Sequence, residues 1–242
     1  MAEVTGISWT DHTHNEWVGC SSTAGAGCDN CYAAARANRF GEDFVKPRLT
    51  SQFNRNNPFR WNKRAAAANV REKVFCGSLM DFFDKNVSAE WRDPLWKKVG
   101  ATSMLDWQIL TKRPSNIATM LPSDWGDGYD NVWLGVTVEN RRSGLRRLEQ
   151  LRDIPAKIRF LSAEPLLEDL GDINLAGINL VIIGGESGAG FRPMRLEWAE
   201  NVIRQCREQG VSVFFKQHGG TSSDAGGCLL NGIEIKEWPI AA

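Results

Sequence analysis

The sequence predicts an α/β protein whose parallel strands form a TIM-like barrel, either closed or partial. Short apolar segments alternate with helical segments along most of the 242 residues. The apolar segments are continuous and do not alternate with polar residues, which is typical of parallel strands buried on both faces. About seven strand–helix units follow one another, and right-handed crossovers of this kind build a barrel. A doubly wound open sheet is the alternative.

Seven segments are predicted as strands because each is short and apolar: 7–9, 73–76, 107–110, 132–136, 158–161, 180–183 and 211–215. Helices are predicted where apolar residues recur at helical spacing or a glycine ends the segment: 31–40, 62–69, 89–99, 142–152 and 196–209. We expect one barrel domain over residues 1–220, with an irregular insertion at 42–72. Residues 221–242 are expected to form a tail with a short hairpin.

Composition narrows the class of protein. The 29 basic and 29 acidic residues balance, which argues against a protein that coats nucleic acid but permits a local basic groove. No apolar run approaches the ~20 residues of a membrane span, and the first residues lack a signal-peptide pattern. We therefore expect a cytoplasmic protein, in which thiols stay reduced and the six cysteines serve as metal ligands or core residues.

Polar residues follow six of the predicted strands. They are Ser78 and Asp81; Thr111, Lys112 and Arg113; Thr137, Glu139 and Asn140; Ser162 and Glu164; Glu186 and Ser187; and Lys216, Gln217 and His218. Loops are polar in most proteins, so one such cluster alone would say little. Because the carboxyl ends of barrel strands share one face, six clusters together predict an active site there.

Three cysteines form the most specific motif. Cys20, Cys28 and Cys31 have the spacing C-x7-C-x2-C. Three thiolates can hold three irons of a four-iron cluster and leave the fourth iron open. The segment between Cys20 and Cys28 consists of small residues, which let the backbone wrap closely around a cluster. The spacing therefore predicts a metal site with one open valence, for which we favour an iron–sulfur cluster over zinc.

Zinc is the main alternative for this motif. Structural zinc takes four ligands, usually from two CxxC-like pairs, and this chain has one such pair. His12 or His14 can complete a Cys3His site, and Cys228 is another candidate fourth ligand. Three buried structural cysteines are a further reading, which the small and polar loop does not favour. Cys76 and Cys206 are predicted to be core residues.

Seven segments resemble, in the same order, those of the three-cysteine-motif proteins often encoded by phages and prophages: WVGC…GCDNCYA, VFCGSLMDFF, LTKRP, WLGVTVEN, RFLSAEPLL, VIIGGESG and VFFKQHGG. The resemblance covers roughly residues 7 to 240. That family's motif is similar to the motif of radical S-adenosylmethionine (SAM) enzymes, and its genes often accompany one for a three-Cys-motif partner protein. The common radical SAM spacing is C-x3-C-x2-C with an aromatic residue before the third cysteine, whereas this chain has a first gap of seven and Asn30.

The resemblance implies a [4Fe–4S] cluster, SAM as cosubstrate and a radical SAM-like partial barrel. In that chemistry the open iron chelates the methionine part of SAM. An electron from the reduced cluster then splits the sulfonium C–S bond, and the resulting 5′-deoxyadenosyl radical abstracts a hydrogen atom from the substrate. An electron donor such as flavodoxin or ferredoxin is implied, and no membrane partner.

Chemistry then suggests roles for the residues at the strand ends. Ser78 and Asp81 are candidates to accept the SAM ammonium, and Lys112 or Arg113 can bind its carboxylate. The candidates for the ribose hydroxyls are Thr137, Glu139 and Asn140. The candidate catalytic residues are Lys112, Glu164, Glu186, Lys216 and His218.

The substrate cannot be identified from the residues, although a phage setting suggests a nucleobase or nucleic acid that is modified or repaired. Two other functions fit the same sequence. One is a binding module pinned by zinc or an iron–sulfur cluster, without SAM chemistry. The other is a barrel enzyme that uses Glu164, Glu186 and Lys216 for acid–base work. A basic stretch between 141 and 147 could face phosphates, but it is interpreted as a solvated helix face balanced by Glu149; its members are Arg141, Arg142, Arg146 and Arg147.

Overall fold

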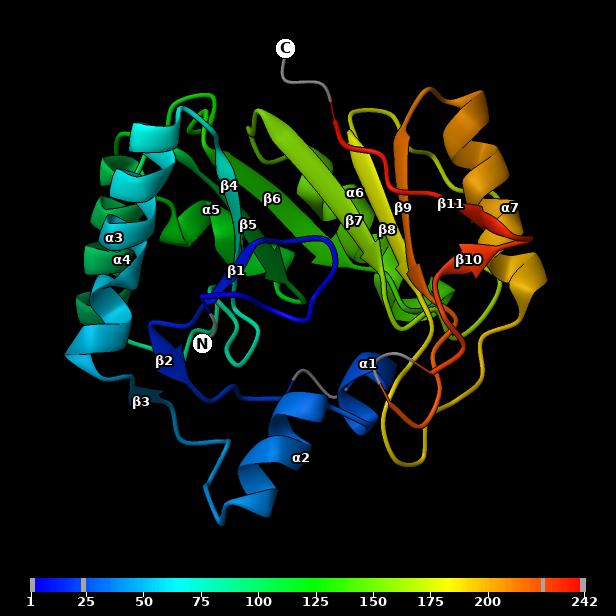
Figure 1. The fold of residues 1–242 in the computed structure, drawn as a ribbon, viewed down its shortest axis with the longest axis horizontal. Helices are drawn as coiled ribbons and strands as arrows, with labels where there is room; N and C mark the ends of the chain where they lie inside the picture. The colour runs from blue at the N-terminus through cyan, green and yellow to red at the C-terminus, as the bar shows by residue number, and fades with distance from the viewer. Residues whose placement is uncertain (1–2, 23–24, 223–224, 240–242) are drawn as a thin grey trace. The chain divides into compact units, whose positions relative to one another are not determined.

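The computed structural model describes residues 3–22, 25–222 and 225–239. Its main feature is a seven-stranded sheet with the order β1-β4-β5-β6-β7-β8-β9 (Figure 1). The strands of this sheet are β1 (His12–His14), β4 (Glu72–Cys76), β5 (Leu105–Thr111), β6 (Val132–Thr137), β7 (Ile158–Ala163), β8 (Leu180–Gly184) and β9 (Ser212–Gln217). The strands are parallel, which confirms the predicted fold class. In the described residues the strand order has two ends, β1 and β9, as in a partial barrel.

The chain divides into two compact units. The first comprises residues 1–23, 33–134 and 154–157, and the second comprises 24–32, 135–153 and 158–242. In the first unit β1 pairs with β4, and β4 pairs with β5. Helix α3 (Gln52–Ala68) packs against β1, β4 and β5. Helix α4 (Ala89–Ala101) also belongs to this unit.

In the second unit β8 pairs with both β7 and β9, and all five residues of β8 are buried. Helix α7 (Leu196–Glu208) packs against β8 and β9. A wide helical turn, η2 (Arg141–Leu145), leads into α6 (Arg146–Arg152). The tail contains the antiparallel hairpin of β10 (Leu229–Leu230) and β11 (Ile233–Glu234).

Shorter elements complete the described fold. They are β2 (Trp17–Val18), α1 (Ala26–Asp29), α2 (Tyr32–Arg39), β3 (Arg48–Leu49), η1 (Pro114–Asn116) and α5 (Ile117–Met120). Strands β2 and β3 pair in antiparallel fashion. Within the described parts of the chain, no helix combines the length and the apolar character needed to cross a bilayer.

The first predicted strand is wrong. Residues 7–9 form no strand, and the first strand of the sheet is instead His12–His14. Its sequence, HTH, is polar, yet all three residues are buried. Burial is tolerated because polar partners replace water. His12 Nε2 lies 2.9 Å from Glu72 Oε2, and the His12 ring stacks on Trp61 with the ring centroids 4.3 Å apart.

The insertion is more helical than predicted. Helix α3 begins at Gln52, ten residues before the predicted start at 62, and it contains Pro58. The Ser51 side chain caps the helix by accepting a hydrogen bond from the Asn54 amide at 3.3 Å. A proline inside a helix removes one hydrogen bond, and here the proline side of the helix is buried with Trp61 and Ala65.

A buried charged cluster lies beside β1. His14 is fully buried, and its Nε2 lies 3.0 Å from Glu16 Oε2. Lys98 on α4 donates a hydrogen bond to the same carboxylate. Over the described residues His14 Nδ1 has no hydrogen-bond partner. Burial lowers the pKa of His14, and the hydrogen bond with Glu16 opposes this shift only in part. The folded chain therefore holds His14 neutral.

This burial predicts acid-sensitive stability. An unfolded histidine titrates near ~6.5. The pKa of His14 is lower in the folded chain than in the unfolded chain. The contribution of His14 to the unfolding free energy is therefore complete above about pH 6.5, and it is lost as the pH falls through the pKa of the folded chain. We expect the unfolding free energy to fall by up to ~1.4 kcal/mol per pH unit below pH ~6.5. Urea unfolding at pH 7.5, 6.5 and 5.5 measures this, and H14Q should flatten the profile. An unchanged slope in H14Q would contradict the assignment.

Candidate functional site

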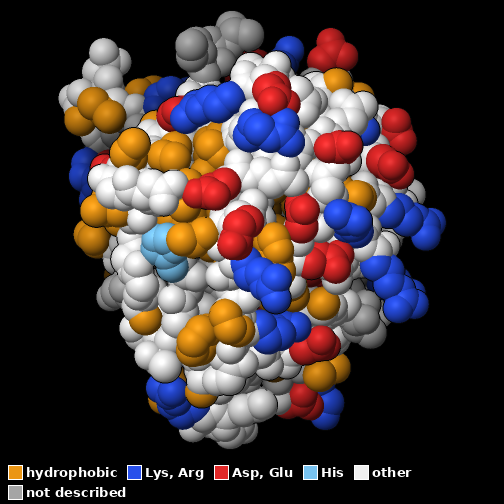
Figure 2. Space-filling view, turned by 90° about the vertical axis from the view of Figure 1, so that its right-hand side faces the viewer, with side chains coloured by type: hydrophobic (Ala, Val, Ile, Leu, Met, Phe, Trp, Pro, Cys, Tyr) orange, Lys and Arg blue, Asp and Glu red, His pale blue; other side chains and the backbone are white. Residues whose placement is uncertain are grey.

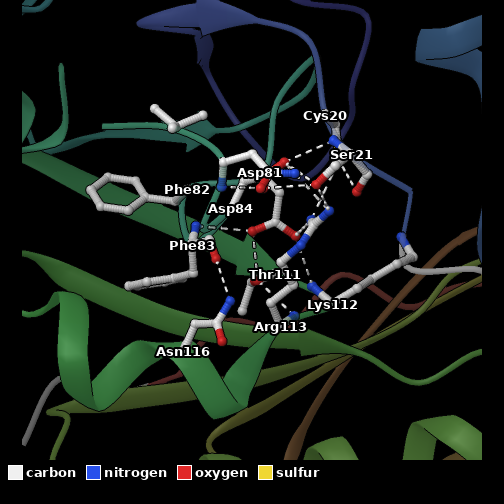
Figure 3. A network of polar contacts seen from close by, with 12 residues as sticks. Cys20, Ser21, Asp81, Phe82, Phe83, Asp84, Thr111, Lys112, Arg113 and Asn116 are labelled. Atoms are coloured by element: carbon white, nitrogen blue, oxygen red, sulfur yellow. Dashed lines mark hydrogen bonds and ion pairs between the residues drawn. The ribbon is translucent and has the colours of Figure 1, made fainter. Parts of the chain in front are cut away.

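In the first unit, Arg113 connects Cys20 to two carboxylates that follow β4 (Figure 3). Its Nη1 lies 2.7 Å from Asp81 Oδ2 and 3.4 Å from Cys20 Sγ. Its Nη2 lies 3.1 Å from Ser21 Oγ and 3.5 Å from Asp84 Oδ2. The side chains of Arg113, Asp81 and Asp84 are at most 9% exposed. The three charged groups therefore form a largely dehydrated cluster behind the first motif cysteine.

Hydrogen bonds hold both carboxylates in place. Asp81 Oδ1 accepts from the Thr111 hydroxyl at 2.7 Å, and Asp81 Oδ2 accepts from the Lys112 amide at 3.2 Å. Asp84 Oδ2 accepts from the Ser21 amide at 2.7 Å. Burial alone would raise the pKa of Asp84, but hydrogen bonds from the Asn86 amide and from Ser21 hold it below its usual value. The residue after Cys20 is thus tied to the loop that follows β4.

The residue before Cys20 must be glycine. Gly19 has a φ of 119°, and a Cβ atom there would lie 2.8 Å from the Cα of Pro47. Its amide donates to the Leu79 carbonyl at 3.0 Å, and the Cys20 amide donates to the Phe44 carbonyl at 2.9 Å. Backbone contacts on both sides therefore set the position of Cys20.

The Cys20 thiol lies in a mixed environment. Burial raises the pKa of Cys20 to about 11, whereas the Arg113 guanidinium acts in the opposite direction. Without a metal the thiol stays protonated at neutral pH. When a metal replaces that proton, Arg113 offsets the negative charge of the thiolate.

In the second unit, Cys28 lies in the short helix α1 and Cys31 directly precedes α2. The Cys28 amide donates to the Gly25 carbonyl at 2.7 Å, and the Cys31 amide donates to the Cys28 carbonyl at 3.3 Å. Both cysteines are half-buried. One helical turn therefore presents the CxxC pair.

Three residues, which we call the Glu186 clasp, hold this turn: Asn30, Glu186 and Arg192. Glu186 Oε2 accepts from Asn30 Nδ2 at 3.0 Å and from the Arg192 amide at 2.8 Å. Arg192 Nη2 donates to Glu186 Oε1 at 2.5 Å and to the Ala26 carbonyl at 2.9 Å. Burial would raise the pKa of Glu186, but the hydrogen bonds from Arg192 and Asn30 bring it below its usual value. Glu186 is therefore ionised and bound to the segment between the cysteines.

Removing Arg192 should loosen the CxxC turn. In R192M the Glu186 carboxylate keeps Asn30 but loses its cation, and the Ala26 carbonyl loses a donor. We expect a loss of about 1–3 kcal/mol in unfolding free energy, and faster hydrogen–deuterium exchange of the amides at 26–31. The matched control is R195M, because Arg195 is exposed and contacts the Trp198 ring. Equal exchange at 26–31 in both variants would contradict the clasp.

Glu139 is fully buried and pairs with Arg147. Arg147 Nη1 lies 2.5 Å from Glu139 Oε2 and donates to the Thr137 carbonyl at 3.0 Å. Glu139 Oε1 accepts from the Gly27 amide at 3.3 Å. The interpretation of residues 141–147 as a solvated face is wrong for Arg147, which is 7% exposed. Arg147 and Leu151 are four residues apart and share a helix face, and this spacing was the sequence signal that could have placed Arg147 toward the interior.

The structure brings two of the candidate catalytic residues together. Lys216 on β9 donates a hydrogen bond to Glu164, which follows β7, and their side chains are 15% and 20% exposed. The Nε2 atom of His218 lies 2.8 Å from the Leu229 carbonyl oxygen of the hairpin.

The remaining candidates have individual settings. Ser78 Oγ accepts from Asn15 Nδ2 at 2.8 Å, and Asn140 Oδ1 accepts from the Ser143 amide at 3.0 Å, which caps η2. Thr137 is buried, and its hydroxyl has no hydrogen-bond partner among residues 3–22, 25–222 and 225–239. Lys112 is half-buried. Their roles in binding a cofactor or substrate stay predictions.

The chemistry of the three motif cysteines fits a metal cluster. All three are half-buried, whereas Cys76 and Cys206 are fully buried. Cys20 belongs to the first unit, and Cys28 and Cys31 belong to the second. Within either unit, the described residues contain no group of three or more His, Cys, Asp or Glu side chains arranged to hold a metal ion. Thiols are the side chains that bind iron–sulfur clusters, and the thiol of Cys20 also lies beside the guanidinium of Arg113.

The histidines proposed for a zinc site have other partners. His12 is bound to Glu72 and His14 to Glu16, at 2.9 and 3.0 Å. Both contacts occupy Nε2 with a carboxylate, and His14 is completely buried. In the part of the chain that the structure describes, neither histidine belongs to a group of three or more His, Cys, Asp or Glu side chains arranged to hold a metal ion.

Comparison with known proteins places the chain in a family. A family model described as "Protein of unknown function (DUF5131)" matches residues 4–239, so the chain belongs to this family. None of the curated proteins matches it. Among solved structures, a doubly substituted spore photoproduct lyase with bound AdoMet and dinucleoside spore photoproduct is similar, with a TM-score of 0.50 and 11% identity. The match covers 82% of this chain and 62% of that one. A singly substituted mutant of the lyase matches with a TM-score of 0.46, 11% identity and coverage of 79% and 59%.

The chain thus spans about three fifths of the length of the lyase structure that it matches. At this identity the similarity shows the fold alone, which is the partial TIM-like barrel expected from the sequence.

Proposed function

We propose that this member of the DUF5131 family is a radical SAM enzyme that holds a [4Fe–4S] cluster on Cys20, Cys28 and Cys31 and uses SAM as cosubstrate. The observation that carries the proposal is that residues at the ends of strands contact the motif cysteines or the segment between them. Arg113, beyond β5, contacts Cys20, and Glu186, beyond β8, holds the turn from Cys28 to Cys31. The lyase of similar fold was solved with AdoMet bound, which agrees with this proposal.

When bound and reduced, the cluster would supply the electron that splits SAM into methionine and a 5′-deoxyadenosyl radical. The chain's own contribution is binding and positioning. Arg113 offsets the charge of the Cys20 thiolate, because its guanidinium already lies 3.4 Å from the sulfur. The Glu186 clasp fixes the backbone between Cys28 and Cys31.

The strand-end residues suggest how SAM would be held. Arg113 is engaged by Asp81 and Asp84, so Lys112 is the cation that we assign to the SAM carboxylate. Thr137 offers a buried hydroxyl without a partner in the described structure, and we assign it to a ribose hydroxyl. Ser78 and Asp81 remain our candidates for the ammonium group, and Glu139 and Asn140 for further ribose contacts.

The substrate that we propose is a nucleobase or a nucleic acid, which the enzyme modifies or repairs. Glu164 and Lys216 form a partly exposed acid–base pair that can hold or move a proton during that reaction. His218 and Glu186 remain candidate catalytic residues, although the Glu186 carboxylate already accepts hydrogen bonds from Asn30 and Arg192. An electron donor of the flavodoxin or ferredoxin kind and a three-Cys-motif partner protein complete the proposal, for a cytoplasmic protein.

SAM cleavage tests this function. The protein is reconstituted anaerobically with iron and sulfide, reduced with dithionite and incubated with SAM. We expect methionine and 5′-deoxyadenosine in equal amounts, measured by liquid chromatography and mass spectrometry, and neither product without reductant. A protein that carries the full cluster but forms no 5′-deoxyadenosine would exclude radical SAM chemistry and favour a metal-pinned binding module.

A further inference from the structure

The segment from residue 33 to residue 71 is strongly basic in a chain that is neutral overall. It contains nine Lys or Arg residues and two Asp or Glu residues, although the whole chain has 29 of each kind. This segment includes the insertion that the proposed chemistry does not use. Three of its aromatic side chains, Phe40, Phe53 and Phe59, are 65%, 66% and 46% exposed.

Helix α3 presents both features together, on what we call the α3 surface: Phe53, Phe59, Arg60 and Lys63. The 17 residues of α3 include four basic residues and no acidic one. Arg60 and Lys63 follow Phe53 by seven and ten residues. The three residues therefore lie along one side of the helix, over a length of about 15 Å. The opposite side is buried with Asn57, Pro58, Trp61 and Ala65.

Among the residues that the structure describes, the two cations of the α3 surface have no acidic partners. Across the described ranges, no carboxylate lies within ion-pair distance of Arg60 or Lys63. Arg60 Nη2 donates to Asn57 Oδ1 at 2.8 Å, and its Cζ lies 4.8 Å from the centroid of the Phe53 ring. The Arg60 guanidinium and the Phe53 ring thus form a solvent-exposed cation–π pair.

The surface around α7 is different. Figure 2 shows basic and acidic side chains interspersed on the face that includes α7 and the hairpin. There Arg204 pairs with Glu208 at 2.7 Å, and Arg207 pairs with Glu237 at 2.6 Å. Such a face is neutralised by its own residues, whereas the α3 surface leaves its positive charge for a partner.

We propose that the α3 surface binds single-stranded nucleic acid. Unpaired cations suit phosphates, and exposed rings suit the stacking of unpaired bases, which is how proteins hold single strands without reading their sequence. A duplex keeps its bases stacked on one another. Its phosphates would contact the cations, but its bases would not stack on the exposed rings. This inference rests on the nucleic-acid substrate proposed above, but it concerns a surface that lies outside the strand-end residues and the motif cysteines.

Fluorescence anisotropy with a labelled 20-nucleotide poly(dT) strand tests this binding in the protein without its cluster. R60Q/K63Q should weaken binding of poly(dT) by at least about tenfold. The slope of the logarithm of the binding constant against the logarithm of the salt concentration should become shallower by about 1.4, because two phosphate contacts are lost. F53A should weaken the binding of the single strand by about fivefold or more and leave the binding of a duplex unchanged. The matched control is R204Q/R207Q, which removes two arginines from α7 and should change binding less than twofold.

Several outcomes would overturn the proposal. They are no binding of poly(dT) by the wild-type protein at low salt, equal losses in the two double variants, or an unchanged affinity in F53A. Binding of anionic lipid vesicles in place of poly(dT) would assign the surface to a membrane instead. Circular dichroism confirms that the variants fold. Because SAM cleavage without substrate does not involve the α3 surface, R60Q/K63Q should keep it, so failure here is distinguishable from failure of the proposed function.

Discussion

Replacing Cys28 by Ala should abolish the iron–sulfur cluster while leaving the chain folded. Cys28 is half-buried in the short helix α1, and removal of one sulfur atom there should change the unfolding free energy by no more than about 1 kcal/mol. The cluster, however, would be left with two of its three thiolates. We therefore expect loss of bound iron, loss of absorbance near ~400 nm and loss of 5′-deoxyadenosine formation after anaerobic reconstitution.

The control for this experiment is C228A. Cys228 is also half-buried, but it precedes the hairpin strand β10 and lies outside the motif. It should retain the iron and sulfide content of the wild-type protein. Two results would contradict the ligand assignment: wild-type iron in C28A, or parallel loss of iron in C228A. The second would also revive Cys228 as a fourth ligand.

Removing the charge of Arg113 should have the largest effect on stability. In R113M the carboxylates of Asp81 and Asp84, both nearly inaccessible to water, lose their shared cation. Breaking a buried ion pair by deleting one partner typically costs about 3–5 kcal/mol, because a buried charge is left uncompensated. We expect a loss of that size in the urea-unfolding free energy of the protein without its cluster.

The neighbouring residue provides the control for R113M. Lys112 is half-buried, and in the described chain no carboxylate lies within ion-pair distance of its ammonium group. K112M should therefore change the unfolding free energy by less than about 1 kcal/mol. Should R113M and K112M prove equally stable, the cluster of Arg113, Asp81 and Asp84 would not support the loop around Cys20 as described.

The sheet could be predicted because parallel strands buried on both faces leave a strong signal. The sequence LVIIG of β8 is continuously apolar, and its five residues are all buried. The first strand left no such signal, because His12 and His14 are polar residues whose burial depends on hydrogen bonds with Glu72 and Glu16. Glu72 belongs to β4, 60 residues from His12 along the chain, so a local pattern does not reveal this partner.

The candidate site shows the same limit. The position of polar residues after strands follows from the order of strands and loops, and the sequence predicted it. Which polar groups pair does not follow, because pairing depends on how loops far apart in the chain meet. Arg192 and Arg147 were missed for this reason, although each neutralises a carboxylate that was predicted to act on SAM or the substrate. Asn30, noted only as a departure from a motif, is bound to Glu186.

Metal analysis after anaerobic reconstitution tests the central claim most directly. The protein is offered iron, sulfide and zinc together, and the bound metals and acid-labile sulfide are counted per chain. The three-thiolate site predicts about four irons and about four sulfides, with no stoichiometric zinc. About one zinc per chain, without iron or sulfide, would contradict it and would make Cys20, Cys28 and Cys31 a structural metal site.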